Sequence, residues 1–166
     1  MAVLAHSLLN QLNWPYSIPE DRPLCAVFSM SMSAGDIPVT LESLWESPHI
    51  LIYLKFSLIV PENRRGEVAM LIATINSEIP FGSWHINLSR GDVWFRIGMR
   101  GGTDDDAGEL DRYLELARKV FADWQKPISV VLSSDIDSEK AFLLKLLIDM
   151  ENPEGAAASL LGRYRP

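Results

Sequence analysis

The residues best suited to chemistry in this chain are three histidines, one cysteine and a run of aspartates. His6, His49 and His85 stand far apart, with no pair at the close spacing that local zinc motifs use. Cys25 has no histidine beside it in sequence, and buried cysteines are usually inert. We therefore predict structural or surface imidazoles for the histidines, and a small apolar strand residue for Cys25.

Three consecutive carboxylates, Asp104 to Asp106, suggest a calcium site at first sight. An EF-hand loop, however, places its ligands at alternate positions and a glycine at the sixth. The run also directly precedes a segment with helical periodicity, where aspartates cap the helix and complement its dipole. We therefore predict a capping role for this run, with no metal site and no cofactor.

Motifs of the common enzyme classes are absent from the sequence. It contains no Gly-x-Ser-x-Gly elbow and no Gly-x-x-x-x-Gly-Lys-Ser/Thr phosphate loop. Gly98, Gly101 and Gly102 are spaced wrongly for a dinucleotide fingerprint. No catalytic residue is assigned, and the sequence predicts a protein that is not an enzyme.

The charge and hydropathy of the chain disfavour two classes of partner. Its 166 residues include 22 acidic and 15 basic side chains, a formal net charge of −7, whereas a nucleic-acid binder is expected to carry a basic stripe. The longest apolar run, 50–60, is broken by Lys55 and is too short to span a bilayer. We expect neither nucleic acid nor membrane as a partner. The single cysteine agrees with a reducing cytoplasm.

Apolar periodicity divides the chain into elements in the order α-βββ-α-ββ-α(α). It predicts a helix over 2–13, strands over 24–33, 39–46 and 50–58, a helix over 61–79, two hairpin strands, and a helix after the aspartates. The segment 128–132 looks strand-like but lies between two helical patterns, so its own residues leave its conformation open. We expect one α+β domain over 1–150 and a mobile tail over 151–166.

The two arms of the hairpin agree on which side is buried. One face holds Trp84, Ile86 and Leu88 on the first arm, and Val93, Phe95, Ile97 and Met99 on the second. An even-numbered loop that sets Leu88 across from Val93 and Trp84 across from Ile97 makes these faces coincide. A three-residue loop would set Ile86 against Trp94, and we reject it on that ground.

The opposite face of the hairpin carries one large aromatic among polar groups, namely Trp94 with His85, Asn87 and Arg96. Aromatic and arginine side chains dominate the energies of protein interfaces. We therefore predict that Trp94, Arg96 and His85 bind a partner. The alternative is that Trp94 is covered within the molecule, for example by the C-terminal helix.

A further helix is predicted after Ser138, and its surface is unusually apolar. It carries Phe142, Leu143, Leu146, Leu147 and Met150. A helix this apolar is buried in a core or against a partner. We predict that these five residues mediate self-association.

Several short motifs resemble one known family. They are Asn76 with the run Ile-Pro-Phe-Gly-Ser-Trp at 79–84, Phe95-Arg96, Val60-Pro61-Glu62, Leu71 with Ile75, and Ala122-Asp123 with Pro127. Over residues 24–133 the chain resembles the YbjN family of bacterial sensory transduction regulators. The resemblance implies the fold of type III secretion chaperones, a twisted antiparallel sheet packed by helices and often a homodimer. It also implies a helix over 107–133, and it supplies no catalytic residues.

Composition and resemblance together predict a chaperone-like or adaptor protein of the cytoplasm. It would bind a protein or peptide partner, in bacterial stress or sensory regulation, and form a homodimer. An extended segment of the partner could lie along the sheet or between helices. The alternative is a small-molecule sensor or enzyme with a cavity between sheet and helices.

Overall fold

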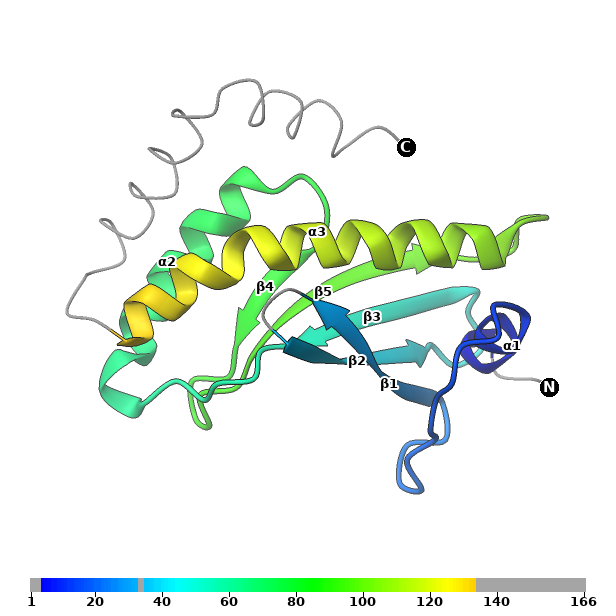
Figure 1. The fold of residues 1–166 in the computed structure, drawn as a ribbon, viewed down its shortest axis with the longest axis horizontal. Coiled ribbons are helices and arrows are strands. Elements are labelled where there is room, and N and C mark those ends of the chain that lie inside the picture. The colour runs from blue at the N-terminus through cyan, green and yellow to red at the C-terminus, as the bar shows by residue number, and fades with distance from the viewer. Residues whose placement is uncertain (1–3, 33–34, 134–166) are drawn as a thin grey trace. The chain divides into compact units, whose positions relative to one another are not determined.

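The computed structural model describes residues 4–32 and 35–133. Its elements are, in chain order, α1 (Leu4–Gln11), β1 (Cys25–Met32), β2 (Gly35–Ser43), β3 (His49–Lys55), the 3-10 helix η1 (Glu62–Arg64), α2 (Arg65–Glu78), β4 (Ser83–Ile86), β5 (Val93–Arg100) and α3 (Asp106–Ser133). The strands form one antiparallel sheet in the order β1-β2-β3-β5-β4 (Figure 1). The predicted α+β class and element order are confirmed. The further helix expected after Ser138 lies outside the described residues.

The chain divides into two compact units. The first comprises the described residues of Met1–Ser57 and Trp94–Arg118, and the second those of Leu58–Val93 and Lys119–Pro166. The expected single domain over 1–150 stays a prediction, and the tail expected at 151–166 lies outside the described residues. Each unit is described by itself below.

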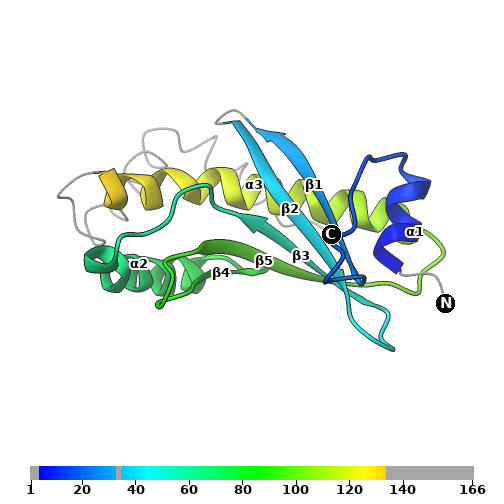
Figure 2. The same ribbon diagram turned by 90° about the horizontal axis from the view of Figure 1, so that it is seen from below.

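The core of the first unit is one face of its sheet. Strands β1, β2, β3 and β5 run side by side (Figure 2), and their register aligns inward-pointing residues in cross-strand rows. One row is Ala26, Leu41, Ile52 and Ile97, and the next is Phe28, Val39, Leu54 and Phe95, all of them buried. Burying each large apolar side chain contributes about 1.5–3 kcal/mol. The alternation predicted for the first and third strands is confirmed.

Helices α1 and α3 supply the other apolar side chains of this unit. Residues 106–118 of α3 lie over one face of the sheet (Figures 1 and 2), with Leu110, Leu114 and Ala117 buried. Helix α1 contacts β1 and β2, and the Ala5 N–H donates to Ser43 Oγ at 3.0 Å. This bond satisfies one of the amide groups that a helix start leaves without an intrahelical partner.

The second strand ends earlier than predicted. Strand β2 stops at Ser43, because Leu44 N–H donates to the His49 carbonyl and Glu46 adopts a positive φ of 54° to close the turn. Trp45 therefore lies in the turn and is 74% exposed. The expected continuation of the strand to residue 46 was wrong. The third strand likewise ends at Lys55, three residues before the predicted end.

Cys25 is a buried strand residue, as predicted, with 1% of its surface exposed. It lies in β1, and the His6 ring Nε2 makes a 3.0 Å hydrogen bond with its carbonyl oxygen. Burial raises the pKa of the thiol, with a smaller opposing effect from Arg22. The thiol therefore stays protonated and poorly nucleophilic at neutral pH.

The second unit is organised around Trp84 on β4. The backbone N–H of Trp84 donates to Asn76 Oδ1 at 2.8 Å, and Asn76 Nδ2 donates to the backbone carbonyl of Trp84 at 3.0 Å. The indole is 1% exposed and stacks on Phe121 with ring centroids 4.9 Å apart. Trp84 is a core residue, as predicted, and the Asn76 side chain binds α2 to the backbone of β4.

The loop between β4 and β5 differs from the predicted one. Asn87 N–H donates to the Asp92 carbonyl at 2.8 Å, so the loop is Leu88 to Gly91. The Asn87 side-chain oxygen accepts the N–H groups of Ser89 and Arg90, which folds the loop onto itself. The predicted pairing of Leu88 with Val93 was wrong, and Leu88 is 59% exposed. The loop is still even-numbered, so Trp84 and Val93 keep their predicted buried side.

Helix α3 continues through Pro127 to Ser133, so the strand-like appearance of 128–132 was misleading and the helix implied by the family resemblance is confirmed. Its second half buries Phe121, Trp124, Ile128 and Val131, which recur at helical spacing. That burial outweighs the β-branched composition and the hydrogen bond that proline cannot donate.

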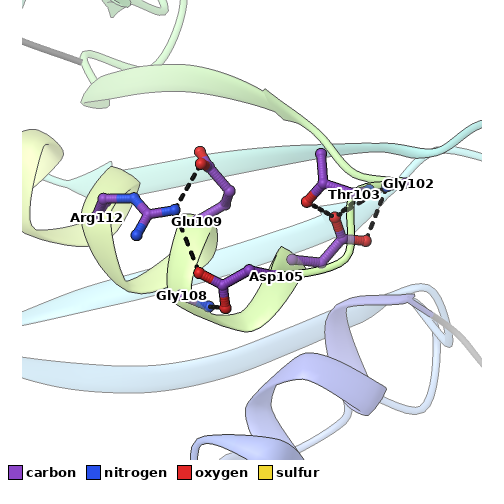
Figure 3. Close-up of polar contacts among 7 residues, drawn as sticks. Gly102, Thr103, Asp105, Gly108, Glu109 and Arg112 are labelled. Carbon is purple, nitrogen blue, oxygen red and sulfur yellow. Dashed lines mark hydrogen bonds and ion pairs between the residues drawn. The ribbon is translucent and has the colours of Figure 1, made fainter.

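The aspartate run begins α3 as a cap (Figure 3). Asp105 Oδ1 accepts the Gly108 N–H at 3.1 Å, while Asp106 turns back to accept the N–H groups of Gly102 and Thr103 and the Thr103 hydroxyl. The predicted capping role is confirmed for Asp105, whereas Asp106 binds the loop that precedes the helix. Within the described residues, no three histidine, cysteine or acidic side chains group as a metal site would need.

We predict that Asp106→Asn destabilises the fold by about 1 kcal/mol at pH 7, because it weakens the bonds to Gly102 and Thr103. Those bonds lower the pKa of the Asp106 carboxyl, the Gly102 N–H most of all. Their contribution is therefore complete above the unfolded pKa of about 3.9 and is lost as pH falls through the lower folded pKa. Urea unfolding at pH 7 and pH 3 should show the difference from wild type shrinking. Asp104→Asn is the matched control, and an equal loss there would contradict the assignment.

We also predict that Asn76→Ala destabilises the protein by about 2 kcal/mol, because it leaves a part-buried backbone N–H and carbonyl of Trp84 unsatisfied. Asn76→Asp keeps the acceptor and loses the donor, so its cost should be intermediate. Chemical unfolding measures all three proteins. Ser77→Ala, on the same helix and exposed, is the control. Equal stabilities for Asn76→Ala and the control would show that this contact does not stabilise β4.

Candidate functional site

The candidate site is the sheet face of the first unit that points away from the buried rows. We call it the β3–β5 outer face, and it consists of His49, Leu51, Tyr53 and Lys55 on β3, and Trp94, Arg96, Gly98 and Arg100 on β5. The two strands are paired so that Lys55 stands across from Trp94, Tyr53 across from Arg96, Leu51 across from Gly98, and His49 across from Arg100. Alternation along the strands places all eight on one side, because their neighbours are the core residues.

Trp94 and Arg96 occupy successive positions of this face. Trp94 is half-buried and Arg96 is exposed. The structure therefore places two of the three predicted partner-binding residues, an aromatic side chain and a cation, two positions apart on one strand. The C-terminal helix that was considered as a cover for Trp94 lies outside the described residues.

His85, the third predicted residue, belongs to the second unit. It is half-buried on β4, and a 2.7 Å hydrogen bond joins its Nε2 to Ser83 Oγ. The structure gives this imidazole a local partner on its own strand. Its predicted role in partner binding stays a prediction.

The polar centre of the β3–β5 outer face is Tyr53. Its hydroxyl donates to Glu42 Oε2 at 3.0 Å, and the other oxygen of Glu42 lies 3.7 Å from the Arg22 guanidinium. Burial raises the pKa of Tyr53, and the hydrogen bond to Glu42 raises it further. The phenol therefore remains protonated at neutral pH, and Glu42 is engaged from two sides.

The two arginines of this face, unlike Tyr53, have no charged partner within the described residues. Among the residues that the structure describes, neither Arg96 nor Arg100 forms an ion pair, and both are exposed. An exposed guanidinium presents five N–H donors in a planar fork, which suits a carboxylate. The geometry can bind an anionic or aromatic group by side-chain contacts.

Sequence reasoning missed Tyr53 and Gly98 as members of this face. The sequence does contain a signal for both residues. Each stands at an alternate position of a strand whose other positions are apolar core residues, so it must point to the outer side. The exposed Trp45 had no such signal, because only the turn at Leu44 to His49 takes it out of the strand.

The second unit holds an apolar surface that the sequence did not predict. Arg65 donates to the carbonyl oxygens of Val60, Leu88 and Ser89 at 3.0–3.2 Å, joining the segment before α2 to the β4–β5 loop. Gly91 has a φ of 82°, and a Cβ there would collide with the Val60 carbonyl. More than half of each of three side chains, Leu58, Ile59 and Leu88, is exposed around this junction.

The five residues predicted for self-association are not among those that the structure describes. Phe142, Leu143, Leu146, Leu147 and Met150, predicted for self-association, lie outside the described residues. Among the described helices, none has the length and apolar character needed to cross a membrane.

Comparison with known proteins agrees with the fold. The family model of YbjN, described as "Putative bacterial sensory transduction regulator", matches residues 6–129. A chain of the solved structure "Crystal Structure of the ExsC-ExsE Complex" is similar with a TM-score of 0.52 and 15% identity, over 80% of this chain and 93% of that one. This likeness shows that the chain shares the fold of that solved chain, so the predicted fold class is confirmed. No curated protein sequence matches the chain. Since the family model covers most of its length, this chain belongs to the YbjN family.

Proposed function

We propose that this protein is a non-enzymatic, chaperone-like adaptor that binds a polypeptide partner in the bacterial cytoplasm, in stress or sensory regulation. The β3–β5 outer face is the proposed contact surface. The observation that carries the proposal is the pairing of a half-buried Trp94 with an exposed Arg96 on a sheet face whose opposite side is closed by the core.

The composition of this face supports binding to a protein. Tryptophan, tyrosine and arginine are the residues most often found as interface hot spots. One of each lies on the two paired strands of this face, namely Trp94 and Arg96 on β5 and Tyr53 on β3. A half-buried aromatic also loses little conformational freedom when a partner covers it, which lowers the cost of binding.

The position of the face indicates how a partner would be held. Strand β3 lies between β2 and β5, and β5 pairs with β3 over residues 94–100, while the four-residue β4 can pair with only half of the other edge of β5. A partner segment that lies on this face meets the outward side chains of both strands, and recognition by side chains is the mode that we propose.

The comparisons support the same class of function. The solved chain of similar fold comes from a complex of two proteins, and the family is described as regulatory. Membership of that family and that fold favours a protein that acts by binding another polypeptide over one that turns over a substrate.

We predict that Trp94→Ala keeps the fold and weakens partner binding by about 2 kcal/mol, roughly thirtyfold, because a hot-spot indole is removed. The measurement is affinity capture from the native cytoplasm read by mass spectrometry, followed by titration with the captured partner. Trp45→Ala removes a more exposed tryptophan of the same unit and is the matched control.

Two other outcomes would contradict this prediction. Loss of the circular dichroism of the fold in Trp94→Ala would show a core role for this residue, and Arg96→Glu then tests the face without removing an aromatic. Equal partner binding by wild type, Trp94→Ala and Arg96→Glu would exclude this face as the contact surface.

We also propose a homodimer that forms through the apolar positions 142–150. Leu143→Asp with Leu147→Asp should then lower the mass measured by light scattering towards that of one chain, because charged groups cannot be buried unpaired in an apolar interface. Lys145→Asp in the same segment is the control. An unchanged mass in the double variant, or a single-chain mass in wild type, would contradict the proposed self-association.

A further inference from the structure

Gly98 is an unusual residue for the middle of a strand. Glycine weakens a strand interior, and where it persists it often marks a place where another chain or a ligand approaches closely. Gly98 lies inside β5 on the β3–β5 outer face, exposed, with Arg96 and Arg100 two positions away on either side.

Nothing within the described fold requires glycine at this position. Its φ lies outside the left-handed region, so other residues can adopt its conformation. A Cβ built on it would meet only Leu51 Cδ2, at an ordinary contact distance of 3.5 Å. Because glycine has no side chain, the surface over Gly98 is open beside Leu51, and we call this position the notch.

The charge around the notch is opposite to that of the whole chain. The formal net charge is −7, yet the eight positions of the β3–β5 outer face include Lys55, Arg96 and Arg100 and no acidic residue. The neighbouring acid, Glu42 on β2, is already bound by Arg22 and Tyr53. Arg96 and Arg100 therefore offer positive charge that no ion pair among the described residues neutralises.

We propose that the notch over Gly98 receives an extended, acidic segment of the polypeptide partner, with carboxylates bound by Arg96 and Arg100. This inference rests on the proposed function and names the chemistry of the partner. The two arginines are four residues apart on a strand, about 13 Å at about 3.3 Å per residue. An extended segment with two acidic residues four positions apart matches that spacing, and its backbone passes over the glycine.

A polypeptide fits this surface better than a nucleic acid does. Two cations are enough to bind two carboxylates of a peptide. A nucleic acid carries one negative charge per nucleotide, and a protein that is acidic overall would repel most of them. The aromatic and apolar neighbours, Trp94, Tyr53 and Leu51, give the segment's other side chains surfaces to contact.

The test uses the full chain and a set of fluorescent twelve-residue peptides in which two glutamates stand two to six positions apart. Fluorescence anisotropy should show the tightest binding at a separation of four, at least about tenfold weaker binding for glutamine counterparts, and weakening at high salt. Gly98→Leu and the pair Arg96→Gln with Arg100→Gln should each weaken binding about tenfold or more. Gly66→Leu and Lys126→Gln, in the second unit, are the controls.

Stability measurements keep the result interpretable. Gly98→Leu should unfold at the same or a higher denaturant concentration, because the site has space and a strand favours a side chain over glycine. Lower stability would contradict the statement that the fold does not require glycine there, and would overturn the proposal.

The remaining outcomes decide between occupants. Equal binding of acidic and glutamine peptides overturns the proposal, as does equal binding to Gly98→Leu. Tighter binding of a single-stranded 20-nucleotide DNA than of the peptides overturns it in favour of a nucleic acid. A loss of self-association in Gly98→Leu overturns it in favour of a second copy of the chain. If the peptides fail while Trp94→Ala still loses the captured partner, the proposed function survives and only the acidic chemistry is wrong.

Discussion

The structure of the first unit depends on the complete burial of one face of its sheet. The cross-strand rows containing Leu41, Ile52 and Phe95 exclude water, and successive residues of a strand point to opposite sides. Closing the inner side therefore fixes which side chains of β3 and β5 face outward. Trp94 and Arg96 owe their position to the burial of Phe95 between them, and a slip of one residue in register would place the arginine in the core.

How far sequence alone could predict this structure follows from the same constraint. Where one face of a strand is strongly apolar, alternation was enough to assign both sides, as it was for β1, β3 and β5. The β4–β5 loop shows the limit of this reasoning. Parity excluded the odd-numbered loop, but the choice between two even registers was made by the Asn87 side chain, which binds two amides of the loop.

Local patterns also failed where tertiary burial decides the conformation. The β-branched residues after Pro127 favour a strand locally, yet they continue α3 because Ile128 and Val131 complete its buried side. At Trp45 the alternating pattern predicted a strand residue on the same side as Leu41, yet this residue lies in a turn and is exposed. Of the candidate site, Trp94 and Arg96 could be found from sequence. The notch at Gly98 could not, because its openness depends on the neighbouring Leu51 of another strand.

The β3–β5 outer face is the surface that we propose to contact a polypeptide partner. Hydroxyl-radical footprinting of the protein with and without its captured partner tests it most directly, with oxidation read residue by residue by mass spectrometry. The partner should protect Trp94 and Tyr53, while Trp45 stays equally reactive. Unchanged oxidation of Trp94 and Tyr53, with protection of Leu88 and its loop instead, would contradict it.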